Sequence, residues 1–420
     1  MPILQNPKAQ MALMLALVMG LAFLPKPGLY SSRNKATLLP TEKKIQENIP
    51  EFAQKGIEYL VEVQFENGGW GAGTHANQGM IDATRVQVDP ATTAFAAMAL
   101  LRAGNTLHDG PHQDNLRRAL LYLVELVEKS PEEALSISEA QGTQPQVKLG
   151  QNIDASMCVQ FFIRIMPHAE KDPKLKNRIS AAIDKCLHKI QKSQSEDGSI
   201  TGGGWAPVLQ SAMANNAMEM AQDQGFKIDE KKLKKSQEYQ RDNVATSGDV
   251  RTERGAGVAL YSVASTQRST AKQARRAQDL VEKARQDGVL APNAPVDAEN
   301  LRKLNLSEEE AKTLSEAYRQ NEITLGQMQD DQILSGFGNN GGEEFLSFMM
   351  TSESLVITGG EAWEKWQAKM YNLLQSIQNQ DGSWNGHHCI TSPVFCTAAC
   401  ILALTAENDR ELLQAEQNKK

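Results

Sequence analysis

His387, His388 and Cys389 form the one dense group of side chains in this sequence that suit zinc. Imidazole nitrogens and a thiolate are zinc ligands, and a carboxylate from Asp82 or Asp154 would have to complete the coordination sphere. No Cys-x2-Cys spacing supports a metal site. In the alternative interpretation, one histidine bonds a carbonyl group or packs on a tryptophan, and Cys389 is a small buried residue. We therefore expect no cofactor, with zinc as the alternative.

The standard motifs of hydrolases and phosphate-binding proteins are absent. The sequence contains no Gly-x-Ser-x-Gly elbow, no His-Glu-x2-His motif and no Walker-type loop. The stretch GFGNNGGEEF at residues 336–345 lacks the spacing of a phosphate loop, so we interpret it as a turn that leads into a helix. Any site must therefore be assembled from residues that the fold brings together.

The charge balance argues against nucleic acid as a partner. The 420 residues include 44 Lys and Arg and 51 Asp and Glu, for a net charge of −7. This balance provides no broad positive field for a phosphate backbone. The basic runs Lys231–Lys235 and Arg268–Arg276 have acidic neighbours, and we interpret them as solvated helix faces.

The N-terminal region contains an unbroken apolar run of 14 residues, Met11–Leu24, followed by Pro25-Lys26-Pro27-Gly28. Because a membrane-spanning helix needs ~20 apolar residues, this run is typical of a secretory signal, and residues 1–35 are predicted to be a signal peptide or a short N-terminal anchor. We expect an exported protein that is periplasmic or associated with the membrane through this segment. A buried first helix in a cytoplasmic protein is the alternative.

Three stretches of the sequence repeat one pattern. KGIEYLVEVQFENGGW (Lys55–Trp70), KCLHKIQKSQSEDGSI (Lys185–Ile200) and KMYNLLQSIQNQDGSW (Lys369–Trp384) align without a gap. Each begins with apolar residues three or four apart, which predicts an amphipathic helix. Each then reaches a glycine that suits a tight turn, and the final Trp offers an apolar plate to a neighbouring unit.

A second, more apolar helix follows each copy, so the predicted unit is an outer amphipathic helix, a glycine-containing turn and a buried inner helix. Degenerate copies bring the number of pairs to six. Residues 287–342 are predicted to be an inserted segment with its own helix, which begins at the Ser307–Glu310 capping box. The expected outer helices are 51–63, 115–128, 178–193, 230–241, 272–286 and 363–378, and the expected inner helices are 91–102, 153–165, 207–221, 255–265, 344–357 and 393–405.

Each pair can bury its apolar face only against its neighbours, and closure into a ring leaves no exposed end. The three copies resemble the QW-type repeats of the squalene–hopene cyclase and protein prenyltransferase superfamily. The resemblance covers most of residues 51–405 and is weak from 225 to 340. It implies an (α/α)6 toroid, an all-α fold that agrees with the count of six pairs. We expect residues 36–420 to form a single toroid.

In such a ring all inner helices begin at the same end, which we call the mouth. Helix N-termini favour anions, and a central concavity is a natural ligand site. The predicted ligand-binding residues are His75, Asp82, Trp205, Glu353 and His387, with Glu353 as a polar group facing the funnel. Further candidates at this end are Asp89, Asp154, Glu253, Arg254, Glu343, Glu344, His388 and Cys389.

The resemblance implies two enzymatic alternatives. Class II terpene cyclases protonate an alkene from an Asp-x-Asp-Asp-Thr-Ala motif; residues 89–94 (DPATTA) match its first Asp and its Thr-Ala but lack both following carboxylates. Zinc-dependent prenyltransferases hold their metal with Asp, Cys and His from different repeats. If the chain is an enzyme, we expect Asp89, Asp154 and His388 to be its catalytic residues.

The low aromatic content of 5% argues against the carbocation-shielding pocket of a cyclase. We therefore expect a toroid that binds an apolar or extended ligand, such as an isoprenoid, a lipid or a peptide, at its mouth and lacks standard cyclase activity. The alternative is a divergent terpene cyclase or a zinc-dependent prenyltransferase-like enzyme.

Overall fold

The computed structural model describes residues 49–337 and 341–415, which belong to one of the two units into which the chain divides, Pro40–Lys420. Among these residues, β structure is limited to three isolated bridges, and the regular elements are helices. The predicted all-α class is confirmed. The apolar run at residues 11–24 and the predicted boundary at residue 35 lie outside the described residues. Within the described part, no helix has the length and apolar character needed to cross a membrane.

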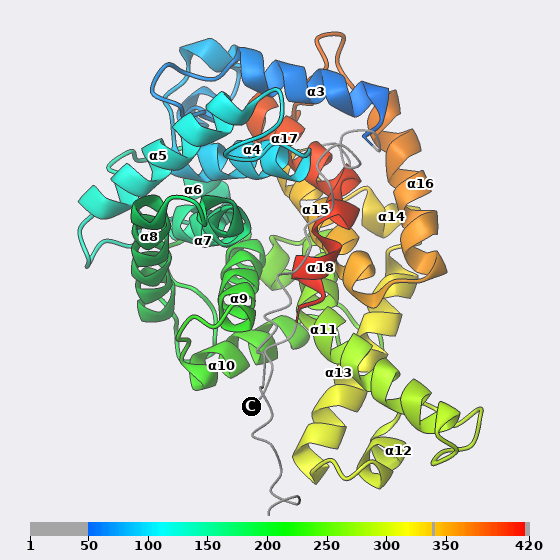
Figure 1. Cartoon of the computed structure of the whole chain (residues 1–420). Helices are drawn as coiled ribbons and strands as arrows, with labels where there is room; N and C mark the ends of the chain where they lie inside the picture. Colours follow the sequence, from blue (N-terminus) through cyan, green and yellow to red (C-terminus); the bar gives the residue numbers. More distant parts are fainter. Residues whose placement is uncertain (1–48, 338–340, 416–420) are drawn as a thin grey trace, which may run out of the picture. The chain divides into compact units, whose positions relative to one another are not determined.

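Six inner helices are buried on all sides. The fourth of them, α11, is buried on all sides only in its first half. In α17, for example, all 12 residues are buried, as expected for a helix that is apolar all round. Each of the six contacts the next one along the chain, and α17 contacts α4 (Figure 1). The six inner helices therefore contact one another in a closed order. The inner helices are α4 (Pro90–Arg102), α7 (Ile153–Ile165), α9 (Pro207–Asp223), α11 (Ala259–Gln286), α15 (Gly342–Thr358) and α17 (Pro393–Leu404).

Six amphipathic helices pack against the inner ones. In α5, Leu116, Leu120 and Leu123 belong to a single buried stripe, the spacing of one helix face. The first outer helix, α3, contacts both the first and the last inner helix. The outer helices are α3 (Glu51–Glu62), α5 (Gln113–Lys129), α8 (Pro173–Lys192), α10 (Glu230–Arg241), α13 (Glu308–Gln327) and α16 (Glu361–Ser376). Shorter helices are η1 (His75–Asn77), η2 (Ala83–Arg85), α6 (Gln144–Leu149), η3 (Met166–Ala169), η4 (Glu253–Gly255), α12 (Ala298–Lys303), α14 (Asp331–Leu334), η5 (Ala406–Asp409) and α18 (Arg410–Leu413).

The fifth pair differs from the prediction. The separate outer helix expected at residues 272–286 is wrong, because these residues continue the inner helix and make α11 28 residues long. No Gly or Pro interrupts this stretch, so nothing in the local sequence ends the helix. Instead α13, which lies inside the predicted insertion, takes the outer position. Its Asn321 Nδ2 donates to the Gln267 carbonyl oxygen at 2.9 Å, and its Gln320 Nε2 donates to the Val244 carbonyl oxygen at 2.8 Å.

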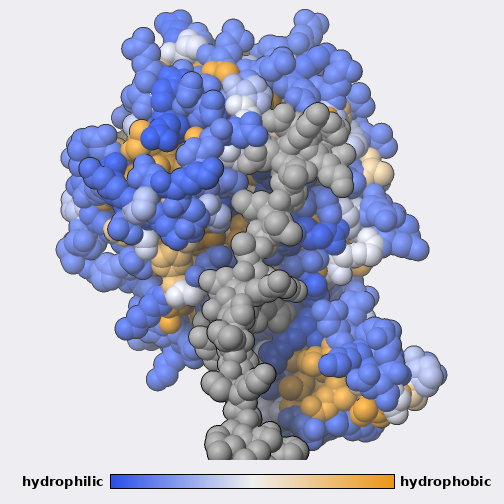
Figure 2. Space-filling model, in the orientation of Figure 1, coloured by the Kyte–Doolittle hydropathy of each residue, from blue (hydrophilic) through white to orange (hydrophobic). Residues whose placement is uncertain are grey.

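The second half of α11, α12 and the first half of α13 enclose a small core of their own. Val281, Leu301 and Leu314 are buried in it. Val289 nearby is 62% exposed, and Figure 2 shows apolar surface over this part of the molecule. Residues 287–342 therefore include both an added lobe and the fifth outer helix.

The repeated Gln and Gly build the same turn in each copy, and Trp joins them in the first and third copies, whereas Ile200 stands at its position in the second. Gln64 Nε2 donates to the carbonyl oxygens of Gly68 (2.8 Å) and Asn115 (2.9 Å), and Asn115 lies in the next outer helix, α5. Trp70 Nε1 donates to the Leu60 carbonyl oxygen at 2.7 Å. The motif thus joins each outer helix to the following one. The same bonds recur from Gln194 to Gly198 and Lys232, from Gln378 to Gly382 and Phe52, and from Trp384 to Leu374.

The third copy joins the last pair to the first. Gln378 Nε2 donates to the Phe52 carbonyl oxygen of α3 at 2.8 Å, and the Phe52 ring packs edge-on against Trp384 with centroids 6.2 Å apart. Gly382 has a φ of 88°, and a Cβ there would lie 2.6 Å from the Lys55 carbonyl oxygen. Glycine is therefore required by both the backbone conformation and the close approach of α3.

The sequence patterns above miss a fourth turn of this kind. Gly248 has a φ of 99°, and Val244 and Val250 form a bridge around it, as Gln194 and Ile200 do in the second copy. Because Val244 replaces the glutamine, Gln327 of α13 supplies the bond to the Gly248 carbonyl oxygen, at 2.7 Å. The motif glutamine is thus replaced by one distant in sequence, which hides the repeat.

Candidate functional site

The connections that lead into the inner helices bond to one another at the mouth. Gln144 of α6 is fully buried, and its Oε1 accepts a hydrogen bond from the Thr391 N–H at 2.7 Å. Thr391 Oγ1 in turn donates to the Gln78 carbonyl oxygen at 2.7 Å. The Trp205 N–H donates to the Val147 carbonyl oxygen at 3.1 Å. The mouth is therefore partly covered by its own loops.

Asp89 and Asp154, which we expected to be catalytic, anchor backbone at the start of α4 and α7. Asp89 accepts from the N–H groups of Thr92 (2.8 Å) and Ala72 (2.9 Å), and Asp154 accepts from the Ile137 N–H (2.9 Å). Burial raises the pKa of each carboxyl to about 6. Both oxygens of each carboxylate nevertheless accept hydrogen bonds from the protein. Asp89 thus caps α4, whereas Asp154, the second residue of α7, binds the loop that contains Ser136 and Ile137.

Three predicted mouth residues lie in the first and sixth connections. Asp82 is exposed and caps η2 by accepting a hydrogen bond from the Thr84 N–H at 3.0 Å. Hydrogen bonds from the Thr84 hydroxyl and from this N–H lower the pKa of Asp82. His387 is also exposed. His75 begins η1, and its Nδ1 is buried without a hydrogen-bond partner among the described residues. Of these three residues, only His75 has a buried polar atom available for a ligand.

Trp205, Phe337 and His388 form what we call the aromatic cluster. The Phe337 ring centroid lies 5.9 Å from that of Trp205 and 4.9 Å from that of His388, both edge-on. Lys148 Nζ lies 4.8 Å from the Trp205 ring centroid, a cation–π contact. Trp205 is 38% exposed and Phe337 is 54% exposed. Three different connections thus present an apolar surface to solvent at the mouth.

Two buried glutamates begin α15 beside the aromatic cluster. Glu344 Oε1 accepts from the Tyr261 hydroxyl (2.9 Å) and from the Phe337 N–H (3.1 Å). Glu343 Oε2 accepts from the Ile390 N–H (3.2 Å). The other oxygen of each glutamate and both ring nitrogens of His388 are buried and have no hydrogen-bond partner among the described residues. This group therefore has unused capacity for hydrogen bonding.

Burial, together with the neighbouring charge of Glu344, raises the pKa of Glu343 to about 7, although backbone hydrogen bonds and Lys148 oppose the shift. The Glu343 carboxyl therefore exchanges a proton close to neutral pH, as a general acid must. Burial also raises the pKa of Glu344. The sequence predicts that Glu343 and Glu344 lie at the mouth but not that their pKa values are raised.

The zinc prediction finds no support in the described part of the chain, where no three His, Cys, Asp or Glu side chains gather to hold an ion. His387 is exposed, whereas Cys389 is a buried free cysteine. Burial raises the pKa of the Cys389 thiol to about 12. The His388 ring packs edge-on against Phe337, with centroids 4.9 Å apart.

Glu353 does not lie at the mouth, which corrects its prediction as a ligand-binding residue there. Its carboxylate pairs with Arg102 (2.6 Å), Arg164 (3.0 Å) and Arg268 (3.3 Å). Arg102 ends α4 and Arg164 is the penultimate residue of α7, so this ion-pair network lies towards the opposite end of the inner helices. Asp409 of η5 also pairs with Arg102 and Arg164, each at 2.6 Å. The network joins three inner helices to α15 and to the C-terminal segment.

Arg268 was expected on a solvated helix face, and this expectation is wrong because its side chain is fully buried. The sequence signal for such a network is a single charged residue in a helix whose other residues are mostly small or apolar. Examples are Arg102 after TTAFAAMALL and Arg164 within VQFFIRI. Isolated buried charges are costly, so they require partners. The sequence does not say which partners these are.

No protein family model matches the chain, and no curated protein is similar to it. The resemblance to the cyclase and prenyltransferase superfamily therefore rests on the repeats.

Proposed function

We propose that the mouth binds an apolar, extended ligand whose chain lies on the aromatic cluster. The observation that carries this proposal is the exposure of Trp205 and Phe337, 38% and 54%, in rings that contact each other and His388. Exposed aromatic rings that gather from separate connections favour a ligand surface over internal packing.

Of the three ligand classes that the sequence suggests, an isoprenoid with a small polar head fits best. Its hydrocarbon chain suits the aromatic rings. Its head could bond the unpartnered oxygen of Glu343 or the unpartnered ring nitrogens of His388. The likeness of the repeats to those of the squalene–hopene cyclase and prenyltransferase superfamily supports the same ligand class. In this proposal the ring is an (α/α)6 toroid that binds its ligand without a metal.

Calorimetric titration of the full chain with farnesol tests this proposal. We expect Trp205→Ala and Phe337→Ala each to weaken binding about tenfold, because an aromatic contact contributes about 1 kcal/mol or more beyond its buried area. Val289→Ala is the matched control, since Val289 is 62% exposed and lies outside the mouth. Equal affinity in all three variants, or no binding to the unaltered chain, would contradict the proposal.

A second candidate is proton transfer to the bound ligand from Glu343. It is favoured by the raised pKa of this carboxyl and by its buried oxygen, which has no hydrogen-bond partner among the described residues. In this reaction the O–H bond of Glu343 breaks, its proton adds to one carbon of an alkene, and the neighbouring carbon becomes a cation. Incubation with squalene, with Glu343→Gln as the comparison, tests this candidate. A product that forms equally in both proteins, or in neither, rejects it and leaves binding alone.

We also propose export, on the strength of the apolar run at residues 11–24. N-terminal sequencing of the protein from fractionated cells tests this proposal. An unprocessed chain found in the cytosolic fraction would refute it.

A further inference from the structure

Three oxygen atoms converge beside Gly341, the N-cap residue of α15. A Cβ at this glycine would lie 2.8 Å from Glu344 Oε2, 3.2 Å from the His388 carbonyl oxygen and 3.7 Å from Glu343 Oε2. The φ of Gly341 is −138°, so its backbone conformation does not require glycine. Three hydrogen-bond acceptors thus face one point that a side chain at position 341 would occupy.

The carboxylate oxygens at this point are deeply buried and only partly used. Glu343 is 0% exposed and Glu344 is 1% exposed. Glu344 Oε2, the atom closest to the Cβ position of Gly341, has no hydrogen-bond partner among the described residues, and neither has Glu343 Oε1. Leaving a buried carboxylate oxygen without a donor is costly. The group therefore suits a donor that a ligand supplies.

These two glutamates also lack a cation. Buried carboxylates are usually paired, yet neither Glu343 nor Glu344 has an ion pair among the described residues. Lys148, whose charge opposes the pKa shift of Glu343, holds its Nζ 4.8 Å from the Trp205 ring centroid instead. Burial raises the pKa of both carboxyls, as expected where no cation offsets the loss of water.

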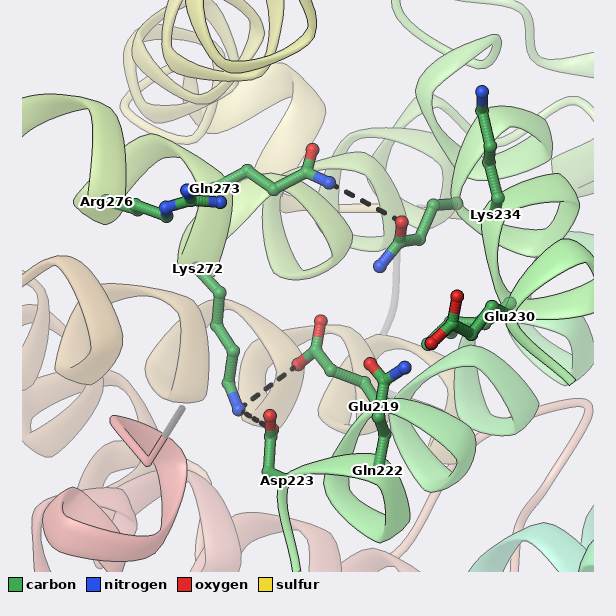
Figure 3. A pocket seen from close by; sticks show the side chains of 10 residues that line it. Glu219, Gln222, Asp223, Glu230, Lys234, Lys272, Gln273 and Arg276 are labelled. Carbon is green, nitrogen blue, oxygen red and sulfur yellow. Dashed lines mark hydrogen bonds and ion pairs between the residues drawn. The ribbon is translucent and has the colours of Figure 1, made fainter. Parts of the chain in front are cut away.

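The concave site between α9, α10 and α11, with a volume of about 510 Å³, differs in this respect. Its Lys272 bonds the carboxylate of Asp223 and lies 3.8 Å from Glu219 (Figure 3). The buried acids of that site therefore already face a cation of the protein, whereas the acids beside Gly341 do not.

We propose that the ligand of the mouth is a long-chain primary amine whose ammonium head lies beside Gly341. An ammonium group carries a positive charge and three N–H donors, which match the missing cation and the three converging oxygens. The aromatic cluster begins at the same place, because the Phe337 N–H donates to the other oxygen of Glu344 and the His388 ring packs on Phe337. The apolar chain of the amine lies on the exposed rings. This inference rests on the proposed function and specifies the head group of its ligand.

Calorimetric titration of the full chain with farnesylamine and with farnesol at neutral pH tests this inference. The two ligands share one apolar chain and differ only in the head, so the ratio of their affinities isolates the ammonium group. We expect farnesylamine to bind about tenfold or more tightly than farnesol, because hydrogen bonds from a charged donor are stronger than neutral ones. Equal affinities would overturn the inference about the head and leave binding of the chain intact. Binding of neither ligand would refute the proposed function, and this inference with it.

Two variants test the position of the head. Glu344→Gln keeps an oxygen for the bonds from Tyr261 and Phe337 and replaces the unpartnered oxygen by an amide nitrogen. Gly341→Ala places a methyl group among the three acceptors. We expect each variant to reduce the preference for farnesylamine to about threefold or less, and circular dichroism and melting temperatures verify that each is folded. Glu139→Gln, at an exposed site in the loop before α6, is the matched control and should keep the full preference.

Three further results would overturn the inference. The first is a preference for farnesylamine that persists in both variants. The second is an equal loss of preference in Glu139→Gln, which would show attraction to general surface charge. The third is displacement of farnesylamine by equimolar CaCl2, which would reassign the oxygens to a metal ion.

Discussion

Replacing Glu343 by glutamine should make the protein more stable above pH 7. The folded state raises the pKa of this carboxyl from 4.5 to about 7, so the folded chain binds this proton more tightly than the unfolded chain does. The free energy of unfolding therefore falls as the pH rises through this window and levels off above it. A shift of roughly 2.5 units at about 1.4 kcal/mol each amounts to about 3 kcal/mol.

Glutamine keeps the size of the side chain and cannot ionise. We expect Glu343→Gln to match the unaltered protein at pH 4.5 and to exceed its stability by up to about 3 kcal/mol at pH 8. Urea unfolding followed by circular dichroism across this range measures the difference. Asp89 and Asp154, whose pKa values burial also raises, will leave a residual slope in the variant. Glu361→Gln controls for the loss of one exposed carboxylate.

Two results would refute this reasoning. If the stability of Glu343→Gln falls with pH as steeply as that of the unaltered protein, the carboxyl does not titrate in this window. If the variant is less stable at every pH, Glu343 is ionised and held by a favourable partner. A variant that is more stable but no longer binds farnesol would indicate that the buried acid is retained for function at the expense of stability.

The remaining predictions concern the joining of the last helix pair to the first and the buried ion pairs. Gly382→Ala should lower the free energy of unfolding by about 2–4 kcal/mol, from the left-handed backbone and the overlap with α3. Gly288 has a φ of 71° and open space around it, so Gly288→Ala should lower the free energy of unfolding by only about 1 kcal/mol. If urea unfolding shows equal losses of stability in Gly382→Ala and Gly288→Ala, tight packing at Gly382 is contradicted. Glu353→Gln should cost about 3–5 kcal/mol because it removes the negative charge that three buried arginines share. Glu407→Gln, in a partly exposed pair with its near neighbour, should cost less than about 1 kcal/mol. Pairing with the arginines lowers the pKa of Glu353, so its contribution should be complete above its ordinary value of about 4.5 and should decline as the pH falls below it. A contribution that does not change below about pH 4.5 would contradict the ion-pair account.

The all-α class and most helix pairs could be predicted from the sequence because their signals are local. Apolar residues three or four apart specify an amphipathic helix, and Gly68, Gly198 and Gly382 end the copies at turns that need positive φ. The Gln and Trp of each copy bond within their own turn and to the adjacent helices, so their spacing survives as a readable repeat. The repeat cannot be recognised in the sequence where the bonding glutamine is distant along the chain. At Gly248, for example, the glutamine that bonds the carbonyl oxygen comes from α13.

The site depended on contacts that no local pattern encodes. Asp89 resembles a catalytic acid in sequence, yet its oxygens are consumed by backbone N–H groups, while Glu343 acquires a raised pKa from burial and from Glu344. The sequence predicts Glu353 to be a polar group that faces the funnel, whereas in the structure its carboxylate pairs with three arginines from separate helices. The sequence by itself determined the helices and their repeat, because helix formation and turns depend on neighbours along the chain. Only the tertiary structure decided which buried charges are paired and which acid stays protonated, because desolvation and ion pairing depend on residues brought together across the fold.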